Sequence, residues 1–181
     1  PKSDDQAFHR ARWWPVLSNQ TAIEEAGAAA ERAGFIVQVD NSCDDWDYER
    51  ASDYLLKRVR ELQKQFSPVC LISGGEVTVK VTGDGGVGGR NQQFALACAA
   101  RIAGEDITVL SAGTDGVDGN SPAAGAVADG STLERARARG LDPGAALARF
   151  DAHPFFKALG DGIETGPTGN NVRDLRILLA W

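Results

Sequence analysis

The chain has 181 residues, 43% of them hydrophobic and 24% charged, and a formal net charge of −6 at pH 7. This length and composition predict a single soluble globular domain with a sizeable core. The acidic balance and the lack of a lysine–arginine block disfavour a nucleic-acid partner. No apolar run approaches the roughly 20 residues of a membrane span.

The first residues raise the question of what precedes them. The chain starts at Pro1 and contains no methionine, so we expect a processed product or part of a longer protein. Residues 1–15 carry the pair Trp13-Trp14, which is costly to leave in water. These residues form either a tail that folds onto its own domain or a remnant that packed on a preceding domain. Residues 16–181 form the α/β domain.

In the first half of the chain, hydrophobic periodicity predicts two helices and three strands. These are helices 21–33 and 48–65 and strands 35–39, 69–73 and 77–82. The residues expected to cap the helices are Ser18 or Asn19 for the first and Asp44, Asp45 and Asp47 for the second. The last two strands are joined across Gly74-Gly75, which predicts a hairpin with strand 77–82 near an edge of a mixed sheet.

In the second half of the chain, predicted helices and strands also alternate. It predicts helix 92–103, strand 107–112, the small-residue run 123–128, short helices 132–139, 143–150 and 154–159, and a final strand 176–180. Strand 107–112 is the best candidate for the centre of the sheet, and His153 is expected to cap the last short helix. This alternation predicts a mixed-sheet α/β sandwich, Rossmann-like, with helices on both faces.

Three glycine-rich loops interrupt the predicted elements, at residues 83–89, 113–119 and 165–171. In α/β sheets, ligands bind beyond the carboxyl ends of the strands. We therefore expect these three loops to lie together at one edge of the sheet.

The loop at 83–89 has five glycines in seven residues and leads into a helix. Free amides at a helix N-terminus, together with the helix dipole, favour a bound anion. Arg90 adds a planar, always-charged fork that suits phosphate or carboxylate. The sequence therefore predicts a phosphate-handling site around Gly88, Gly89 and Arg90.

The same loop matches the dinucleotide-binding pattern GxGxxG through Gly83, Gly85 and Gly88. The sequence around these glycines, however, differs from that of a dinucleotide-binding site. The preceding run alternates polar and apolar residues, the helix starts late, and no acidic residue closes a second strand about 20 positions later. A Walker motif is also absent from the sequence, because no Gly-Lys-Ser/Thr follows.

Several polar residues of the loops have two interpretations each. Asp115 and Asp118 are either turn residues or carboxylates that orient a substrate hydroxyl or hold Mg²⁺. Thr168 caps a helix or belongs to a second oxyanion loop. Glu76 is either a site acid or, as we expect, an exposed hairpin residue. The sequence shows no serine–histidine or cysteine–histidine nucleophile pair, which disfavours acyl-transfer chemistry.

The three cysteines, Cys43, Cys70 and Cys98, lack metal-ligand spacing. Cys70 and Cys98 lie in apolar runs and are predicted to be buried thiols. Free thiols fit a cytoplasmic location.

Four blocks of the sequence together resemble one known family. They are LISGGEVT at 71–78, GGRNQQFAL at 88–96, GTDGVDG with AAGA at 113–126, and TGPTGNNVRDL at 165–175. These blocks resemble the C-terminal MOFRL domain of the glycerate 2-kinase family, of which some members are labelled hydroxypyruvate reductase. The chain departs from the family pattern at Val77, Gln93 and Asn170, none of which removes a charged site residue.

The resemblance implies ATP-dependent, Mg²⁺-assisted phosphorylation of D-glycerate, a small sugar acid, to 2-phosphoglycerate. It also implies an N-terminal nucleotide-binding domain that this chain lacks, so that the chain carries one wall of the active site. Arg90 would neutralise charge on the transferred phosphoryl group, and Asp115 would orient the attacking hydroxyl or contact the metal. The further expected substrate- or phosphate-binding residues are Gly88, Gly89, Asn91, Thr114, Asp118 and Thr168. No dedicated metal ligand is assigned.

Two alternatives stay open. One is an NAD(P)H-dependent reductase that acts on hydroxypyruvate. The other is a ligand-binding module without catalysis, which would bind an anion or pack on a partner. The particular sugar acid and the oligomeric state, including a homo-oligomer, also stay open.

Overall fold

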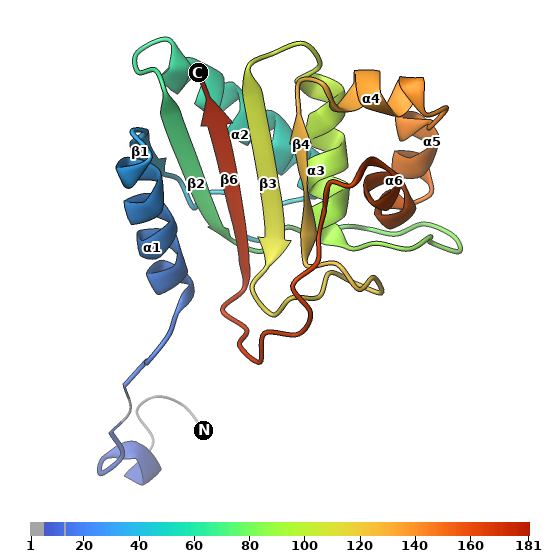
Figure 1. Ribbon diagram of the computed structural model, residues 1–181. Coiled ribbons are helices and arrows are strands. Elements are labelled where there is room, and N and C mark those ends of the chain that lie inside the picture. Colours follow the sequence, from blue (N-terminus) through green and yellow to red (C-terminus); the bar gives the residue numbers. More distant parts are fainter. Residues whose placement is uncertain (1–5, 13) are drawn as a thin grey trace.

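The computed structural model describes residues 6–12 and 14–181 and has a six-stranded mixed sheet at its centre (Figure 1). The strand order is β1-β2-β6-β3-β4-β5. The strands are β1 (Ile36–Val39), β2 (Val69–Gly75), β3 (Ile107–Gly113), β4 (Gly125–Asp129), β5 (Gly162–Ile163) and β6 (Asp174–Ala180). Strands β1 and β2 are parallel, and the other neighbouring pairs are antiparallel.

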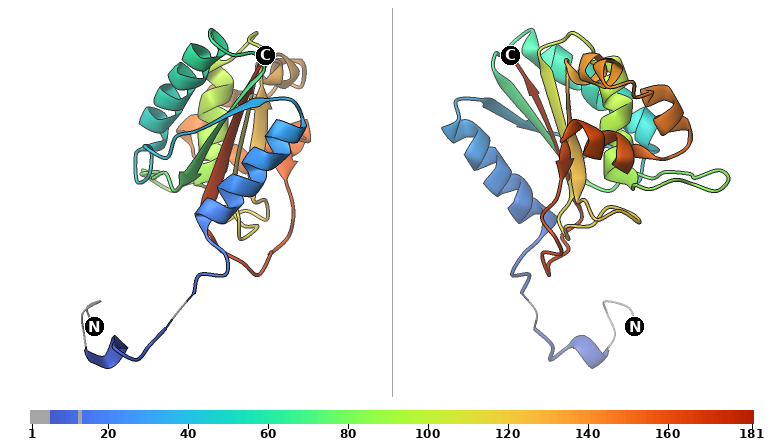
Figure 2. Two further views of the ribbon diagram at one scale, coloured as in Figure 1. Left: turned by 90° about the vertical axis from the view of Figure 1, so that its left-hand side faces the viewer. Right: turned by 45° about the vertical axis from the view of Figure 1, so that its right-hand side comes forward.

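Helices cover both faces of the sheet, as predicted. They are the 3-10 helix η1 (Gln6–Phe8), α1 (Asn19–Arg32), α2 (Tyr48–Gln63), α3 (Arg90–Arg101), α4 (Thr132–Ala138), α5 (Pro143–Ala148) and α6 (Ala152–Leu159). Helix α1 packs on β1 and β2 from one side, whereas α2 and α3 pack on the other side (Figure 2). Helices α4, α5 and α6 lie next to α3. The mixed-sheet α/β sandwich is therefore confirmed.

The main core lies between the sheet and helices α2 and α3. The apolar stripe of α2 is buried through Ala51, Leu55, Val59 and Leu62, which recur at spacings of three and four. Each fully buried leucine stabilises the fold by about 2 kcal/mol relative to an exposed one. The helix begins where the carboxylate of Asp47 accepts hydrogen bonds from the first turn, so this cap is confirmed. Ser18 caps α1 in the same way.

The predicted hairpin is wrong. Strand β2 pairs along its whole length with β6 on one side, the side that a hairpin partner would need, and residues 69–72 pair with β1 on the other. Gly75 adopts a φ of +85°, a conformation that glycine tolerates best, and the chain turns away from the sheet there. Thr78 forms only an isolated bridge with Asp47. Residues 76–89 therefore form a long loop, and strand 77–82 does not exist.

Burial of the cysteines agrees with the prediction for Cys70 and Cys98, and Cys43 is buried as well; all three are free thiols. Burial raises the pKa of Cys43 and of Cys70 to about 11, and it also raises the pKa of Cys98. These thiols are therefore protonated and unreactive near neutral pH.

Residues 6–12, which include η1, lie away from the sheet and its helices (Figure 1). The Trp14 side chain is 74% exposed, whereas Trp13 lies outside the described residues. That this segment once packed on a preceding domain stays a prediction. In the part of the chain that the structure describes, none of the helices combines the length and apolar character needed to cross a membrane.

Candidate active site

The three glycine-rich loops meet at one edge of the sheet, where β2 and β3 end and β6 begins (Figure 1). The amide of Asn120 donates to the carbonyl of Gly88, and the amide of Thr168 donates to the carbonyl of Asp115. These bonds join the second loop to the first and to the third, as the sequence predicted. Beside them lies a pocket of about 820 Å³, within the range of small-molecule sites.

The amides of the first glycine loop are mostly used within the protein. The Val87 amide donates to the Asp151 carboxylate, and the Gly88 amide donates to the side-chain oxygen of Asn120. In the described part of the chain, the amides of Gly89 and Arg90 have no acceptor. The amides of Gly89, at the end of the loop, and of Arg90, the first residue of α3, are therefore open to an anion at the pocket that both residues line.

Asp118 occupies the rest of the N-terminus of α3. Its Oδ1 accepts from the backbone and side-chain nitrogens of Asn91, and its Oδ2 accepts from those of Gln92, all within 3.2 Å. Burial raises the pKa of Asp118, and these four donors oppose that shift. Both groups of the Asn91 side chain are also used, because its oxygen accepts from Ser111. A direct contact of Asp118 or Asn91 with substrate stays a prediction.

Close packing explains the glycine at the helix start. A Cβ at Gly89 would lie 2.4 Å from the backbone and carboxylate of Asp118. Only glycine lets the loop approach the carboxylate that caps α3. The glycine therefore serves the internal cap as well as ligand access.

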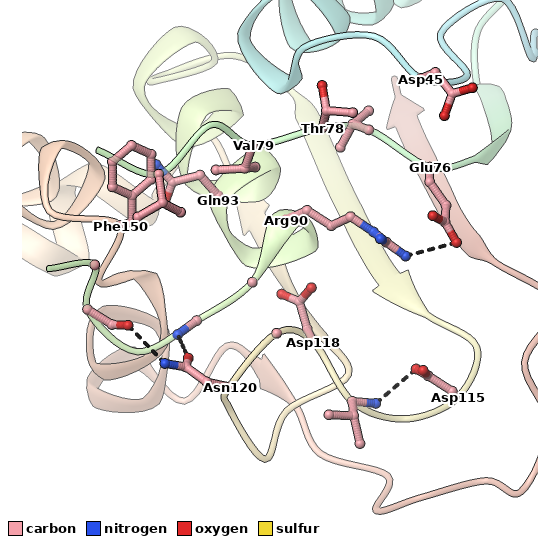
Figure 3. Close-up of a pocket in the computed structure, with 18 of the residues that line it drawn as sticks. Asp45, Glu76, Thr78, Val79, Arg90, Gln93, Asp115, Asp118, Asn120 and Phe150 are labelled. Atoms are coloured by element: carbon pink, nitrogen blue, oxygen red, sulfur yellow. Dashed lines mark hydrogen bonds and ion pairs between the residues drawn. The ribbon is translucent and has the colours of Figure 1, made fainter. Parts of the chain in front are cut away.

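Arg90 is held by two carboxylates at the pocket, those of Asp174 and of Glu76, and Figure 3 shows the second of these pairs. Its Nε and Nη2 donate to the two oxygens of buried Asp174, at 2.6 and 3.0 Å, and Nη2 lies 3.0 Å from Oε1 of Glu76. The bidentate bond to Asp174 raises the pKa of Arg90. Among the described residues, Nη1 has no partner. The guanidinium is therefore fixed in orientation and keeps one nitrogen for a ligand.

Glu76 and Asp44 correct two predictions. Glu76 is no exposed hairpin residue: it lines the pocket, pairs with Arg90 and lies 3.9 Å from Nε of Arg173. Asp44 does not cap α2; it binds Arg173 through two bonds of 2.8 and 2.6 Å. Asp45 lines the pocket rather than capping α2. The position of Glu76 just past the carboxyl end of β2 was the signal that could have placed it here.

The Asp44–Arg173 pair predicts a pH dependence. The bonds from Arg173 lower the pKa of Asp44 in the folded protein. This pair therefore stabilises the fold above the unfolded pKa, about 3.9, and that contribution is lost as pH falls below it. We expect the Tm difference between wild type and Asp44→Asn to narrow as pH falls from about 5 to about 3. Thermal melts across this range check it, and a constant difference would contradict it.

Asp115 lies on the pocket wall, and the local turn uses only one of its two carboxylate oxygens (Figure 3). Its Oδ1 accepts from the amide of Val117 at 3.1 Å, which fixes the side chain as a turn residue. Within the described residues, Oδ2 accepts no hydrogen bond. The two interpretations of Asp115 are therefore compatible, because one oxygen holds the turn and the other faces no protein donor.

Thr114 and Thr168 connect the loops and do not line the pocket. The Thr114 hydroxyl donates to the carbonyl of Arg173 and accepts from the amide of Val172. The Thr168 hydroxyl donates to the carbonyl of Thr114. Their binding of substrate stays a prediction. Asn171, which the sequence analysis passed over, does line the pocket.

His153 does not cap α6. It lies inside the helix, is buried, and its Nδ1 is 3.2 Å from the side-chain oxygen of Gln92. The contact of His153 with Gln92 therefore helps to hold the first turn of α3 in place.

The charge of the pocket is unbalanced. Among the described residues that line it, four are carboxylates and one, Arg90, is a cation. In the same part of the chain, no group of three or more histidine, cysteine, aspartate or glutamate side chains is arranged to hold a metal ion. The wall is therefore acidic around a single fixed arginine.

These features define an α/β domain with a polar ligand pocket at the strand ends, built from glycine loops around a fixed arginine. Residues 69–174 match the MOFRL family, and the chain belongs to that family. The resemblance noted in the sequence is thereby confirmed.

Relatives of the chain carry two kinds of name. D-glycerate 2-kinase of Thermotoga maritima is 38% identical over 163 residues, which cover 87% of this chain and 39% of that protein. A putative hydroxypyruvate reductase of Agrobacterium vitis is 46% identical over 114 residues, covering 62% of this chain and 30% of that protein. The chain thus spans well under half the length of these relatives.

A solved structure shares the fold. The crystal structure of glycerate kinase from Thermotoga maritima superposes with a TM-score of 0.84 at 37% sequence identity. The match covers 91% of this chain and 41% of that one. The whole described domain, rather than the matched motifs alone, therefore has a counterpart of known structure.

Proposed function

We propose that this chain forms one wall of the active site of an ATP-dependent glycerate 2-kinase, which phosphorylates D-glycerate to 2-phosphoglycerate. The observation that carries the proposal is Arg90, which is fixed by Asp174 and Glu76 beside the Gly89 and Arg90 amides, neither of which has an acceptor in the described part of the chain. Phosphoryl transfer depends on positioning and charge stabilisation more than on a covalent nucleophile. A rigid guanidinium with an open nitrogen serves both needs.

The geometry supports the following roles in this proposal. ATP supplies the phosphoryl group when it is bound. Nη1 of Arg90 and the amides of Gly89 and Arg90 would bind oxygens of that group or the substrate carboxylate. The free Oδ2 of Asp115 would accept a hydrogen bond from the attacking hydroxyl of glycerate and then its proton. The oxygen–phosphorus bond to glycerate forms as the bond to the leaving ADP oxygen breaks.

The acidic wall supports a site that is completed by other residues. Glycerate and ATP are both anions, yet four carboxylates face one guanidinium here. Cations from elsewhere must balance them, as basic residues or as Mg²⁺. Without a three-ligand cluster in the described residues, Mg²⁺ would be held mainly by phosphate oxygens and water, with Asp115 as the candidate protein ligand on this wall.

The reductase alternative rests on the name of the Agrobacterium vitis relative. The glycine loop gives it little support. The dinucleotide fingerprint joins a strand directly to a helix through a tight turn, whereas here the long loop 76–89 separates β2 from α3.

One pair of assays decides between these proposals. The longest natural protein that carries this chain is given ATP, Mg²⁺ and D-glycerate, and ADP and 2-phosphoglycerate are measured. The same sample is given NADPH and hydroxypyruvate, and NADPH oxidation is measured. Glycerate-dependent ADP formation without NADPH oxidation is expected, and the reverse would replace the kinase with the reductase.

The 181-residue chain alone is expected to show no ATP-dependent phosphorylation of glycerate, because in this proposal a separate nucleotide-binding domain supplies the other wall of the site. The same assay with the purified chain checks this expectation. Activity of the chain alone would overturn the one-wall proposal, whereas ligand binding without turnover would match the binding-module alternative for the isolated chain.

A further inference from the structure

Arg176 is a buried cation that the candidate site does not use directly. It lies in the middle of β6, between β2 and β3, and its side chain has no exposed surface. Its Nη2 donates to the carbonyl oxygens of Gly74 at 2.6 Å and Gly75 at 3.2 Å. Among the residues that the structure describes, its Nε and Nη1 have no hydrogen-bond partner. Two backbone carbonyls and the Phe94 ring, whose centre lies 5.8 Å from Cζ, therefore surround a guanidinium that has no carboxylate partner among the described residues.

Stability does not explain this residue. Burying a guanidinium without a carboxylate is costly, and an apolar side chain of similar size would pack at lower cost. Its surroundings are suited to such a side chain, since Leu178 on the same face of β6 belongs to the main core and the Phe94 ring centre lies 5.8 Å away. A residue that breaks the local pattern at such a cost indicates a function.

The carbonyls that Arg176 holds come just before Glu76. At Gly75 the chain leaves the sheet, and the next residue places its carboxylate 3.0 Å from Arg90. By restraining both carbonyls, Arg176 fixes the point from which the Glu76 side chain starts. Asp174, two residues earlier on the same face of β6, binds Arg90 directly. Strand β6 is thus linked to Arg90 in two ways. Asp174 binds Arg90 directly, and Arg176 is linked to it through the Gly74-Gly75 backbone and Glu76.

We infer that Arg176 is a positioning residue for Arg90, which acts through the Gly74-Gly75 backbone and Glu76. Its kinetic consequence rests on the proposed kinase function. Its geometric consequence, a fixed Glu76–Arg90 pair, can be measured without that function.

The kinetic test uses Arg176→Met, which removes the donors and keeps an apolar side chain of similar length, in the longest natural protein that carries this chain. We expect kcat to fall about 10- to 100-fold, because small misplacements at reacting groups cost this much. In a Glu76→Gln background the same change should cost less than about twofold, since the path through Glu76 is already broken. An equal loss in both backgrounds would overturn the inference.

The geometric test follows the Nε–H signal of Arg90 by NMR in the same protein. Arg176→Met should shift or broaden this signal, as Glu76→Gln does. Leu178→Ala is the matched control, because it lies on the same face of β6 and should lower Tm while leaving the Arg90 signal and kcat unchanged. An unchanged Arg90 signal in Arg176→Met overturns the positioning role. If the wild type phosphorylates no glycerate, the proposed function fails and the NMR result still decides this inference.

Discussion

Arg90→Ala is expected to lower kcat/KM for glycerate phosphorylation at least about a hundredfold, the usual scale for loss of a transition-state donor. The expectation follows from the bidentate bond to Asp174 and the contact with Glu76, which orient the guanidinium before any ligand arrives. In the Arg90→Ala variant, the carboxylates of Asp174 and Glu76 would lose this partner and would repel the anionic substrates of the proposed reaction. Steady-state kinetics in the longest natural protein that carries this chain measure the effect.

The matched control is Arg101→Ala. Arg101 lies at the other end of α3, where it pairs with Asp53 away from the pocket. It should retain near-normal kinetics, which separates loss of this site from loss of any arginine on the helix. Arg90→Lys should recover only part of the activity, because lysine keeps the charge but lacks the fork. A near-normal kcat/KM for Arg90→Ala would contradict the proposed role of Arg90 in phosphoryl transfer.

Asp118→Ala is expected to destabilise the fold by about 3 kcal/mol, because a helix cap and several buried hydrogen bonds are lost together. For a domain of this size that corresponds to a fall in Tm of about 10 °C. The physical reason is that the amides and side chains of Asn91 and Gln92 would lose their shared acceptor in a buried position. Thermal and urea unfolding measure the change.

Asp115→Ala is the control for this prediction. Asp115 is in the same loop, three residues earlier, but among the described residues its carboxylate accepts a single hydrogen bond, from the Val117 amide. Its removal should change stability by less than about 1 kcal/mol while lowering kcat. Equal destabilisation by the two substitutions would contradict the assignment of Asp118 as the cap of α3.

Local signals in the sequence predicted most helices and strands. The stripe of α2, the apolar run of β2 and the glycine ends of the helices depend on neighbours a few residues apart, so periodicity locates them. The meeting of the three glycine loops also followed from a general rule about strand ends. These features required no knowledge of distant pairing.

The errors came from partners far apart in the chain. Arg176 and Gly74 are 102 positions apart, and the pairing of β6 with β2 removed the edge that the predicted hairpin needed. Asp118 caps a helix that begins 28 residues before it, so its turn-like context could not reveal the carboxylate's acceptors. Glu76 was predicted to be exposed because strands 69–73 and 77–82 were predicted to form a hairpin.

The position of β6 has a consequence for how the protein reaches its native state. It is the last strand of the chain, yet it joins the β1-β2 pair to the β3-β4-β5 group. Until residues 174–180 insert, these two parts expose unpaired edges and the sheet is incomplete, a topology of long-range contacts that favours slow folding. Asp174 belongs to the same strand, so the bidentate bond to Arg90 requires β6 in its place in the sheet. Completion of the sheet and orientation of Arg90 therefore depend on the same seven residues.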